Sequence, residues 1–215
     1  MRLIATDYDG TLNHGGIDQE KLDAIRRWRA AGNLFGVISG RGPGFLKELQ
    51  EKLGDNFDFL VSCNGGVAAD SRGNELFRHP CDSVDVNAFV SDIFDWGANC
   101  LYVDYDDQCV LLGTEECREP YDHIPPEDLP PVASFYKMAT FFETPEEAQA
   151  MAARIREKYG DKVALIGAVT PANAVIGTDE EWDKQCTDQI DAMAKGGGFL
   201  LATGCEYPAN ASFDR

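Results

Sequence analysis

Residues 2–12 read Arg-Leu-Ile-Ala-Thr-Asp-Tyr-Asp-Gly-Thr-Leu, and the predicted fold is arranged around them. The short apolar run before Asp7, followed by a turn at Gly10, is typical of a buried parallel strand. In open α/β sheets, ligands bind at the carboxyl ends of such strands. Asp7 and Asp9 stand two residues apart in extended chain, so their side chains point the same way. The stretch therefore predicts a strand that delivers two carboxylates to one site.

Two carboxylates in one site repel each other unless one is protonated or a cation lies beside them. A hard divalent cation with oxygen ligands, Mg²⁺ above all, resolves this conflict. Gly10 permits a sharp turn, and the amides beside it can face a phosphate. The alternative is that Asp7 and Asp9 are ordinary loop or helix-capping residues.

The run Asp7-Tyr8-Asp9-Gly10-Thr11 resembles the first motif of the haloacid dehalogenase-like (HAD) hydrolases, which are mostly Mg²⁺-dependent phosphatases. The resemblance implies that Asp7 attacks phosphorus to form an aspartyl-phosphate. It implies that Asp9 protonates the leaving alcohol and then activates the water that clears the intermediate. It also implies that Asp7 and the backbone carbonyl of Asp9 hold Mg²⁺, and that Thr11 takes part in phosphate binding.

The next segment predicts a βαβ unit, with an amphipathic helix from residue 17 to Gly32 and a second buried strand over 33–38. This strand ends in Ser39-Gly40-Arg41, which resembles the Thr-Gly-Arg of the Cof-type branch of the family. The resemblance implies that Ser39, with Gly40 beside it, holds the transferring phosphoryl group. Taken alone, Ser39 would be a turn residue. Arg41 contacts the substrate phosphate or pairs with a surface carboxylate, and the sequence leaves both open.

A third strand is predicted over 58–63, after a helix over about 43–54, and it ends in Asn64-Gly65-Gly66. In the same branch an Asn-Gly pair at this point lines the cleft, which implies a substrate-binding role for Asn64. A tight turn rich in Asn and Gly explains these residues nearly as well. Residues 67–70 and 75–78 predict a hairpin.

Residues 81–160 resemble the larger α+β cap of this hydrolase branch, inserted after the core segment 1–80. A helix is predicted over 84–96, strands over 99–103, 108–112 and 133–142, and a helix over 144–159 with Thr144 as its N-cap. Residues 113–132 are predicted to be a long proline-rich loop. Asp104, Asp106 and Asp107 form either a metal cluster or, as we favour, a solvated hairpin turn.

The resemblance weakens after residue 160. A complete member of the branch carries a Lys that offsets the phosphate charge and a Gly-Asp-x-x-x-Asp run that completes the Mg²⁺ shell, and neither is evident. Lys184 and Lys195 lie in a helical segment without the expected context. Asp179 and Asp183 are candidate metal ligands four residues apart, but a helix N-terminus capped by Thr178 explains them better.

Residues 161–215 instead resemble the C-terminal part of the uroporphyrinogen decarboxylase and cobamide methyltransferase family. In that family's methyltransferases, a cysteine in the position of Cys205 binds zinc. One thiolate does not make a zinc site, and about 50 residues do not close a barrel. Residues 163–168, 174–177 and 198–203 are predicted strands, with a helix around Glu181 packed beside them.

Composition limits the function classes. The net charge is −18, and residues 81–215 carry 9 Lys and Arg against 26 Asp and Glu, which disfavours nucleic acid and anionic membranes as partners. Seven scattered cysteines without a Cys-x-x-Cys pair argue against a disulfide framework. No stretch suits a membrane span or a signal peptide, which predicts a cytoplasmic protein. The oligomeric state is not set by the sequence.

The sequence as a whole predicts an α/β fold: a Rossmann-like HAD core, an inserted α+β cap, and an atypical or incomplete C-terminal part of the core. The first functional hypothesis is a Mg²⁺-dependent hydrolase of phosphate esters that acts on a small phosphorylated metabolite. A second hypothesis is a catalytically inactive hybrid. A third is a fragment of a uroporphyrinogen decarboxylase-like methyltransferase, with its function around Cys205.

Overall fold

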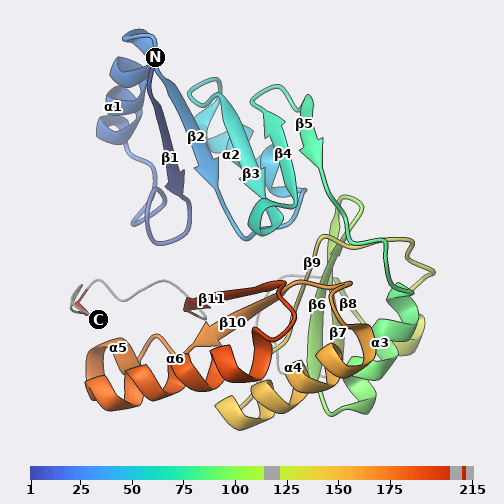
Figure 1. Ribbon diagram of the computed structural model, residues 1–215. Coiled ribbons are helices and arrows are strands. Elements are labelled where there is room, and N and C mark those ends of the chain that lie inside the picture. Colours follow the sequence, from blue (N-terminus) through green and yellow to red (C-terminus); the bar gives the residue numbers. More distant parts are fainter. Residues whose placement is uncertain (114–121, 204–209, 212–215) are drawn as a thin grey trace. The chain divides into compact units, whose positions relative to one another are not determined.

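The computed structural model describes residues 1–113, 122–203 and 210–211 (Figure 1). It divides into two compact units. The first comprises residues 1–94 and 98–140, and the second comprises residues 95–97 and 141–215.

The first unit contains a five-stranded sheet in the order β1-β2-β3-β4-β5. Strands β1, β2 and β3 are parallel, whereas β4 is antiparallel to both β3 and β5. The elements of this part are β1 Leu3–Asp7, α1 Gln19–Ala30, β2 Leu34–Ile38, α2 Phe45–Leu53, β3 Phe59–Ser62, a 3₁₀ turn Cys63–Gly65, β4 Val67–Asp70 and β5 Glu75–Arg78. The predicted parallel α/β arrangement is thereby confirmed.

Helix α1 begins and ends where its sequence signals place it. The side chain of Asp18 accepts a hydrogen bond from the amide of Lys21, which satisfies one of the free donors of the first turn. Gly32 follows the helix at φ +79°, a conformation that favours glycine over any other residue. Ile25 is buried on the inner face of the helix.

One apolar cluster joins α1, α2 and the sheet. Alternate residues of β2, Phe35 and Val37, point to the same face and meet both helices there. Its buried members are Tyr8, Leu12, Ile25, Phe35, Val37, Phe45, Leu49, Leu53, Phe57 and Leu60. Tyr8 is fully buried between the two candidate aspartates, so the core itself holds the turn in place.

The first unit also holds a second sheet, in the order β8-β7-β6-β9. Its elements, with the helix before it, are α3 Val86–Asp95, β6 Cys100–Tyr105, β7 Gln108–Gly113, β8 Asp122–Ile124, a 3₁₀ turn Pro126–Asp128 and β9 Lys137–Ala139. The rings of Phe89 on α3 and Phe135 stack at a centroid distance of 6.0 Å. The predicted hairpin of two strands about an Asp-rich turn is confirmed in β6 and β7.

The second unit is built from α4 Pro145–Tyr159, β10 Leu165–Val169, α5 Asn173–Ile176, α6 Asp179–Met193 and β11 Phe199–Thr203. Strands β10 and β11 pair in parallel, and α6 lies against both (Figure 1). Both long helices begin with a capping box, Thr144 with Glu147 and Thr178 with Glu181. The predicted N-cap role of Thr144 is confirmed, and so is the capping interpretation of Thr178.

Three sequence expectations were wrong in detail. Strand β1 is at an edge of its sheet, so Leu3 and Ile4 are 58% and 42% exposed instead of buried. The predicted strand over 133–142 is only β9, because Phe135 pairs with Cys81 instead of β6. Residues 173–176 form α5 instead of the strand predicted over 174–177.

The loop predicted over 113–132 was also wrong in part, because residues 122–124 within it form β8. Residues 114–121 of that loop lie outside the described part of the chain. Among the described residues, no helix combines the length and apolar character needed to cross a membrane.

Candidate functional site

The carboxyl ends of three parallel strands are aligned by their register. Asp7 of β1 is paired with Ile38 of β2, and Ile38 is paired with Val61 of β3. The residues that follow each strand therefore emerge at one edge of the sheet. This edge brings together the turn after Asp7, the Ser39-Gly40-Arg41 segment and the turn at Asn64, as the sequence predicted for strand ends.

The turn after β1 is closed by its own backbone. The amides of Leu12 and Asn13 donate to the carbonyls of Asp7 and Tyr8 at 3.2 and 2.8 Å. Gly10 has φ +70°, which allows the chain to reverse here. The hydroxyl of Thr11 donates to Oδ2 of Asp7 at 3.2 Å, so one carboxylate oxygen is oriented from within the turn.

Arg41 grips the carboxylate of Asp9. Its Nε and Nη2 each donate at 2.8 Å, to Oδ2 and Oδ1 respectively, so the pair is bidentate. The third nitrogen, Nη1, donates to Glu48 on α2 at 2.6 Å. Arg41 thus pairs with two carboxylates, one of which is the predicted general acid/base Asp9, and its contact with a substrate phosphate stays a prediction.

The guanidinium of Arg41 is also held from its faces. It lies 5.2 Å from the ring centroid of Tyr8 and 4.9 Å from that of Phe45, distances typical of cation–π contacts. The hydrogen bond to Asp9 is the main cause that raises the pKa of Arg41, and burial opposes it. Glu48 also forms an ion pair with Lys52, whose Nζ lies 3.0 Å from Oε1 of Glu48. Arg41 is therefore fixed in place by both charge and packing.

Ser39 is buried, with 4% of its surface exposed. Its amide donates to the carbonyl of Val61 at 2.9 Å, and its hydroxyl accepts a hydrogen bond from the amide of Arg41 at 3.2 Å. Asn64 is exposed and has φ +53°, a left-handed conformation that Asn tolerates better than most residues. A Cβ atom on Gly40 would lie 2.8 Å from Oδ1 of Asn64, so Gly40 and Asn64 lie directly against each other.

The oxygen atoms at the first turn suit one side of a Mg²⁺ ion. The carboxylate of Asp7 is exposed, and the hydrogen bonds of the turn use the carbonyls of Asp7 and Tyr8, which leaves the carbonyl of Asp9 outside that set. Carboxylate and carbonyl oxygens are the ligands that Mg²⁺ takes, and it keeps several waters. Within residues 1–113, 122–203 and 210–211, no group of three or more His, Cys, Asp or Glu side chains is arranged to hold a metal.

The distal candidates lie in the second unit. Asp179 and Asp183 are in the first two turns of α6, and Asp179 belongs to the acidic first turn of its capping box. Lys184 follows on the same helix, where it is 73% exposed at its side chain and paired with Asp188. The metal-binding role of Asp179 and Asp183 stays a prediction, and Cys205 lies outside the described residues.

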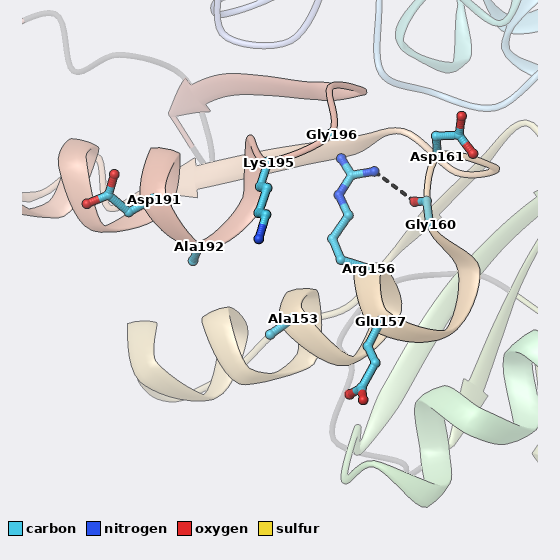
Figure 2. Close-up of a pocket in the computed structure, with 9 residues that line it drawn as sticks. All are labelled: Ala153, Arg156, Glu157, Gly160, Asp161, Asp191, Ala192, Lys195 and Gly196. Carbon is cyan, nitrogen blue, oxygen red and sulfur yellow. Dashed lines mark hydrogen bonds between the residues drawn. The ribbon is translucent and has the colours of Figure 1, made fainter.

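A hollow of about 640 Å³ lies in the second unit beside the end of α4. Figure 2 shows Arg156 and Lys195 among the residues that line it. The guanidinium of Arg156 donates to the backbone carbonyls of four residues, at distances from 2.6 to 3.3 Å: Gly160, Val163, Met193 and Gly198. Because these carbonyls occupy its donors, Arg156 joins segments of the unit instead of offering its charge to a ligand.

The sequence did not reveal Asp104 and Lys137 as neighbours of the Ser39-Gly40-Arg41 turn. Asp104 was assigned to a solvated turn, but it is fully buried and its carboxylate lies 3.0 Å from the ammonium of Lys137. Lys137 in turn donates to the carbonyl of Gly40. The available signal was the pattern of β6, because an acid within a run of apolar strand residues is unusual without a countercharge.

The parallel sheet, its flanking helices and the paired aspartates after the first strand define a class, the Rossmann-like α/β proteins with a carboxylate site at the strand ends. Within this class, the sequence profile of the haloacid dehalogenase-like hydrolases matches residues 4–180. The chain belongs to that family. The matched range includes the start of the segment 161–215, whose resemblance to the uroporphyrinogen decarboxylase family stays a prediction.

Solved structures show the same fold. A haloacid dehalogenase-like hydrolase from B. subtilis is 16% identical with a TM-score of 0.55, and the match covers 94% of this chain and 89% of that one. A Thermotoga maritima protein is 16% identical with a TM-score of 0.57, covering 78% and 65%. A protein described as a HAD subclass IIB sugar phosphatase is 17% identical with a TM-score of 0.55, covering 70% and 62%.

At these identities the likeness concerns the fold. The chain covers less than two thirds of the length of both the sugar phosphatase and the Thermotoga maritima protein. Among curated proteins, none matches the sequence significantly.

Proposed function

We propose that this protein hydrolyses phosphate monoesters of small metabolites, such as sugar phosphates, in a Mg²⁺-dependent reaction. The observation that carries the proposal is the register that aligns Asp7 with Ile38, the residue before Ser39, since it brings the carboxylate of Asp7 to the same edge of the sheet as the Ser39 turn. Membership of the hydrolase family and the fold shared with a sugar phosphatase support it.

In the proposed reaction, Asp7 attacks phosphorus and the alcohol leaves, which produces an aspartyl-phosphate that water then clears. Asp9 gives its proton to the leaving oxygen and takes one from the water. The hydroxyl of Thr11 orients Asp7, while Ser39, Gly40 and Asn64 bind the phosphate. These groups act mainly by positioning and by neutralising charge, which is how phosphoryl transfer is catalysed in general.

The carboxylate of Asp7 and the backbone carbonyl of Asp9 would hold Mg²⁺. The bound ion would neutralise charge on the phosphoryl oxygens. In the proposed reaction, Arg41 orients Asp9, and the buried Ser39 fixes the turn after β2. We further propose that residues 81–160 serve as a cap that selects the substrate, and that the protein is cytoplasmic.

A second candidate is a catalytically inactive member of the family. It is favoured by one observation, namely that the described residues contain no group of three or more His, Cys, Asp or Glu side chains arranged to hold a metal. Such a protein would bind Mg²⁺ or phosphate weakly and turn nothing over.

The test is hydrolysis of p-nitrophenyl phosphate with Mg²⁺, with EDTA, and by two matched Asp→Asn variants. We expect activity with Mg²⁺ only, a loss of at least a thousandfold in Asp7→Asn, and near wild-type rates in the control Asp82→Asn, which changes an exposed acid outside the site. Circular dichroism confirms that both variants fold. A folded wild-type protein that is inert with Mg²⁺, or an Asp7→Asn variant that keeps its rate, would overturn the proposal.

A further inference from the structure

A buried carboxylate lies beneath the Ser39 turn. Asp104 has no exposed surface, and it is paired across the antiparallel strands β6 and β9 with Lys137. The ammonium of Lys137 lies 3.0 Å from Oδ2, yet among the described residues neither oxygen of Asp104 accepts a well-aligned hydrogen bond. Burying a carboxylate is unfavourable unless a countercharge is close, so Lys137 is what makes Asp104 tolerable here.

Two thiols, Cys63 and Cys109, also interact with Asp104. Burial, and then the negative charge of Asp104, raises the pKa of Cys63 to about 12. Burial, and then the nearby carboxylate of Asp104, raises the pKa of Cys109 as well. Neither thiol supplies a countercharge, which leaves the pair of Asp104 with Lys137 close to neutral overall.

Lys137 uses its remaining hydrogen-bonding capacity on the backbone. It donates to the carbonyl of Gly40, which stands between Ser39 and Arg41. Because Asp104 cancels most of its charge, Lys137 acts on its surroundings chiefly through this directed hydrogen bond.

Residues 39–44, here called the anchor loop, approach the β6–β7 hairpin closely, as the space around two of their glycines shows. A Cβ on Gly42 would lie 2.9 Å from Oδ1 of Asp104, and one on Gly44 would lie 3.3 Å from the carbonyl of Asp107. Neither glycine has a positive φ, so it is the limited space and not the backbone conformation that favours glycine at both positions. The anchor loop therefore rests directly on the β6–β7 hairpin, next to the buried pair.

We propose that Lys137 is a positioning residue of the active site, which holds the anchor loop through the carbonyl of Gly40 with Asp104 as its buried counterion. This inference rests on the proposed function, because it assigns Lys137 the task of keeping Ser39 and Arg41 in place for the phosphoryl group. Lys137 does not touch the reacting atoms.

The experiment combines hydrogen–deuterium exchange of the peptide spanning residues 36–45 with kcat and KM for p-nitrophenyl phosphate. The single variant Lys137→Met leaves Asp104 buried and unpaired and can fail to fold. The main test is therefore the double variant Asp104→Asn with Lys137→Met, which removes both charges at nearly constant volume. Lys137→Arg tests rescue by another cation, and Lys184→Met removes an exposed lysine of α6 as the control.

We expect the folded double variant to exchange its 36–45 amides at least tenfold faster than wild type. We also expect its kcat to fall at least tenfold, while Lys137→Arg keeps most of both properties and Lys184→Met keeps all of them. Unchanged exchange in the folded double variant would overturn the inference, and so would faster exchange with unchanged kcat. If wild type has no activity, the proposed function fails by itself, while the exchange measurement still decides whether Lys137 fixes the loop.

Discussion

Arg41 offers the sharpest test of how the site is assembled, because its two possible roles give different kinetics. Its fork occupies both oxygens of Asp9 at 2.8 Å, so we expect it to orient the general acid/base. A hydrogen bond to a charged group contributes about 1.5–3 kcal/mol when water is excluded. The side chains of Arg41 and Asp9 are 35% and 51% exposed, so solvent screening reduces the combined contribution of the fork to about 1–2 kcal/mol.

This contribution corresponds to a loss of about 5- to 30-fold in kcat for Arg41→Met. KM should change little, because the lost interaction orients a catalytic group instead of binding substrate. Arg41→Lys keeps the charge but not the fork, so it should recover only part of the rate. Steady-state kinetics with p-nitrophenyl phosphate provide the measurement, and Arg27→Met, which changes an exposed arginine of α1, is the matched control.

The orienting role of Arg41 is refuted if Arg41→Met raises KM tenfold or more and leaves kcat unchanged, since Arg41 would then bind the substrate phosphate. It is equally refuted if Arg41→Lys matches wild type, because the bidentate geometry would then be irrelevant. A loss that also appears in Arg27→Met would indicate a general effect of removing positive charge.

Two further predictions concern titratable groups away from the reacting atoms. Asp58 accepts two hydrogen bonds from Arg29 and one from the amide of Phe35; burial raises its pKa, but these bonds outweigh burial and lower the pKa overall. Because the folded-state pKa is lowered, the stabilisation by Asp58 is complete above the unfolded pKa of about 4 and is lost as the pH falls below it. Asp58→Asn should therefore lower the free energy of unfolding in urea by about 1–3 kcal/mol at pH 7, and by progressively less below pH 4. A difference between variant and wild type that does not change with pH would contradict this. For Cys63, burial raises the pKa from 9.0 to about 12, which lowers the thiolate fraction at pH 8 about a thousandfold. Site-resolved alkylation should therefore leave Cys63 unmodified in the folded protein and modify it in urea, and rapid native labelling would show that the thiol is not buried as described.

The sequence predicted the parts of the fold that local signals determine. Caps at Thr144 and Thr178 located two helix starts, because each is set by a side chain and amides within one turn. Apolar runs located β2, β3 and the β6–β7 hairpin for the same reason. The prediction of one strand over 133–142 was wrong because strand pairing depends on residues far away in the sequence. Here Phe135 pairs with Cys81, whereas β9 pairs with β6.

The positions of the candidate residues in the fold were predictable to a similar degree. Asp7, Asp9 and Ser39 follow directly from strand ends, and the register confirms that they share an edge. The contacts of Arg41 with Glu48 and Phe45 depend on where helix α2 lies, which no local pattern reveals. The pairing of Asp104 with Lys137 joins residues on strands that are not adjacent in sequence, and only the sheet order brings them together.

Arg156 has a consequence for how the second unit opens. Its single guanidinium serves carbonyls at the end of α4, at the end of α6 and just before both β10 and β11. If the chain frays at any one of these ends, an N–H group of the same guanidinium that holds the other ends loses its partner. Local unfolding of one end is therefore unfavourable for the whole unit. We therefore expect residues 145–203 to lose amide protection together, as one cooperative block, instead of helix by helix.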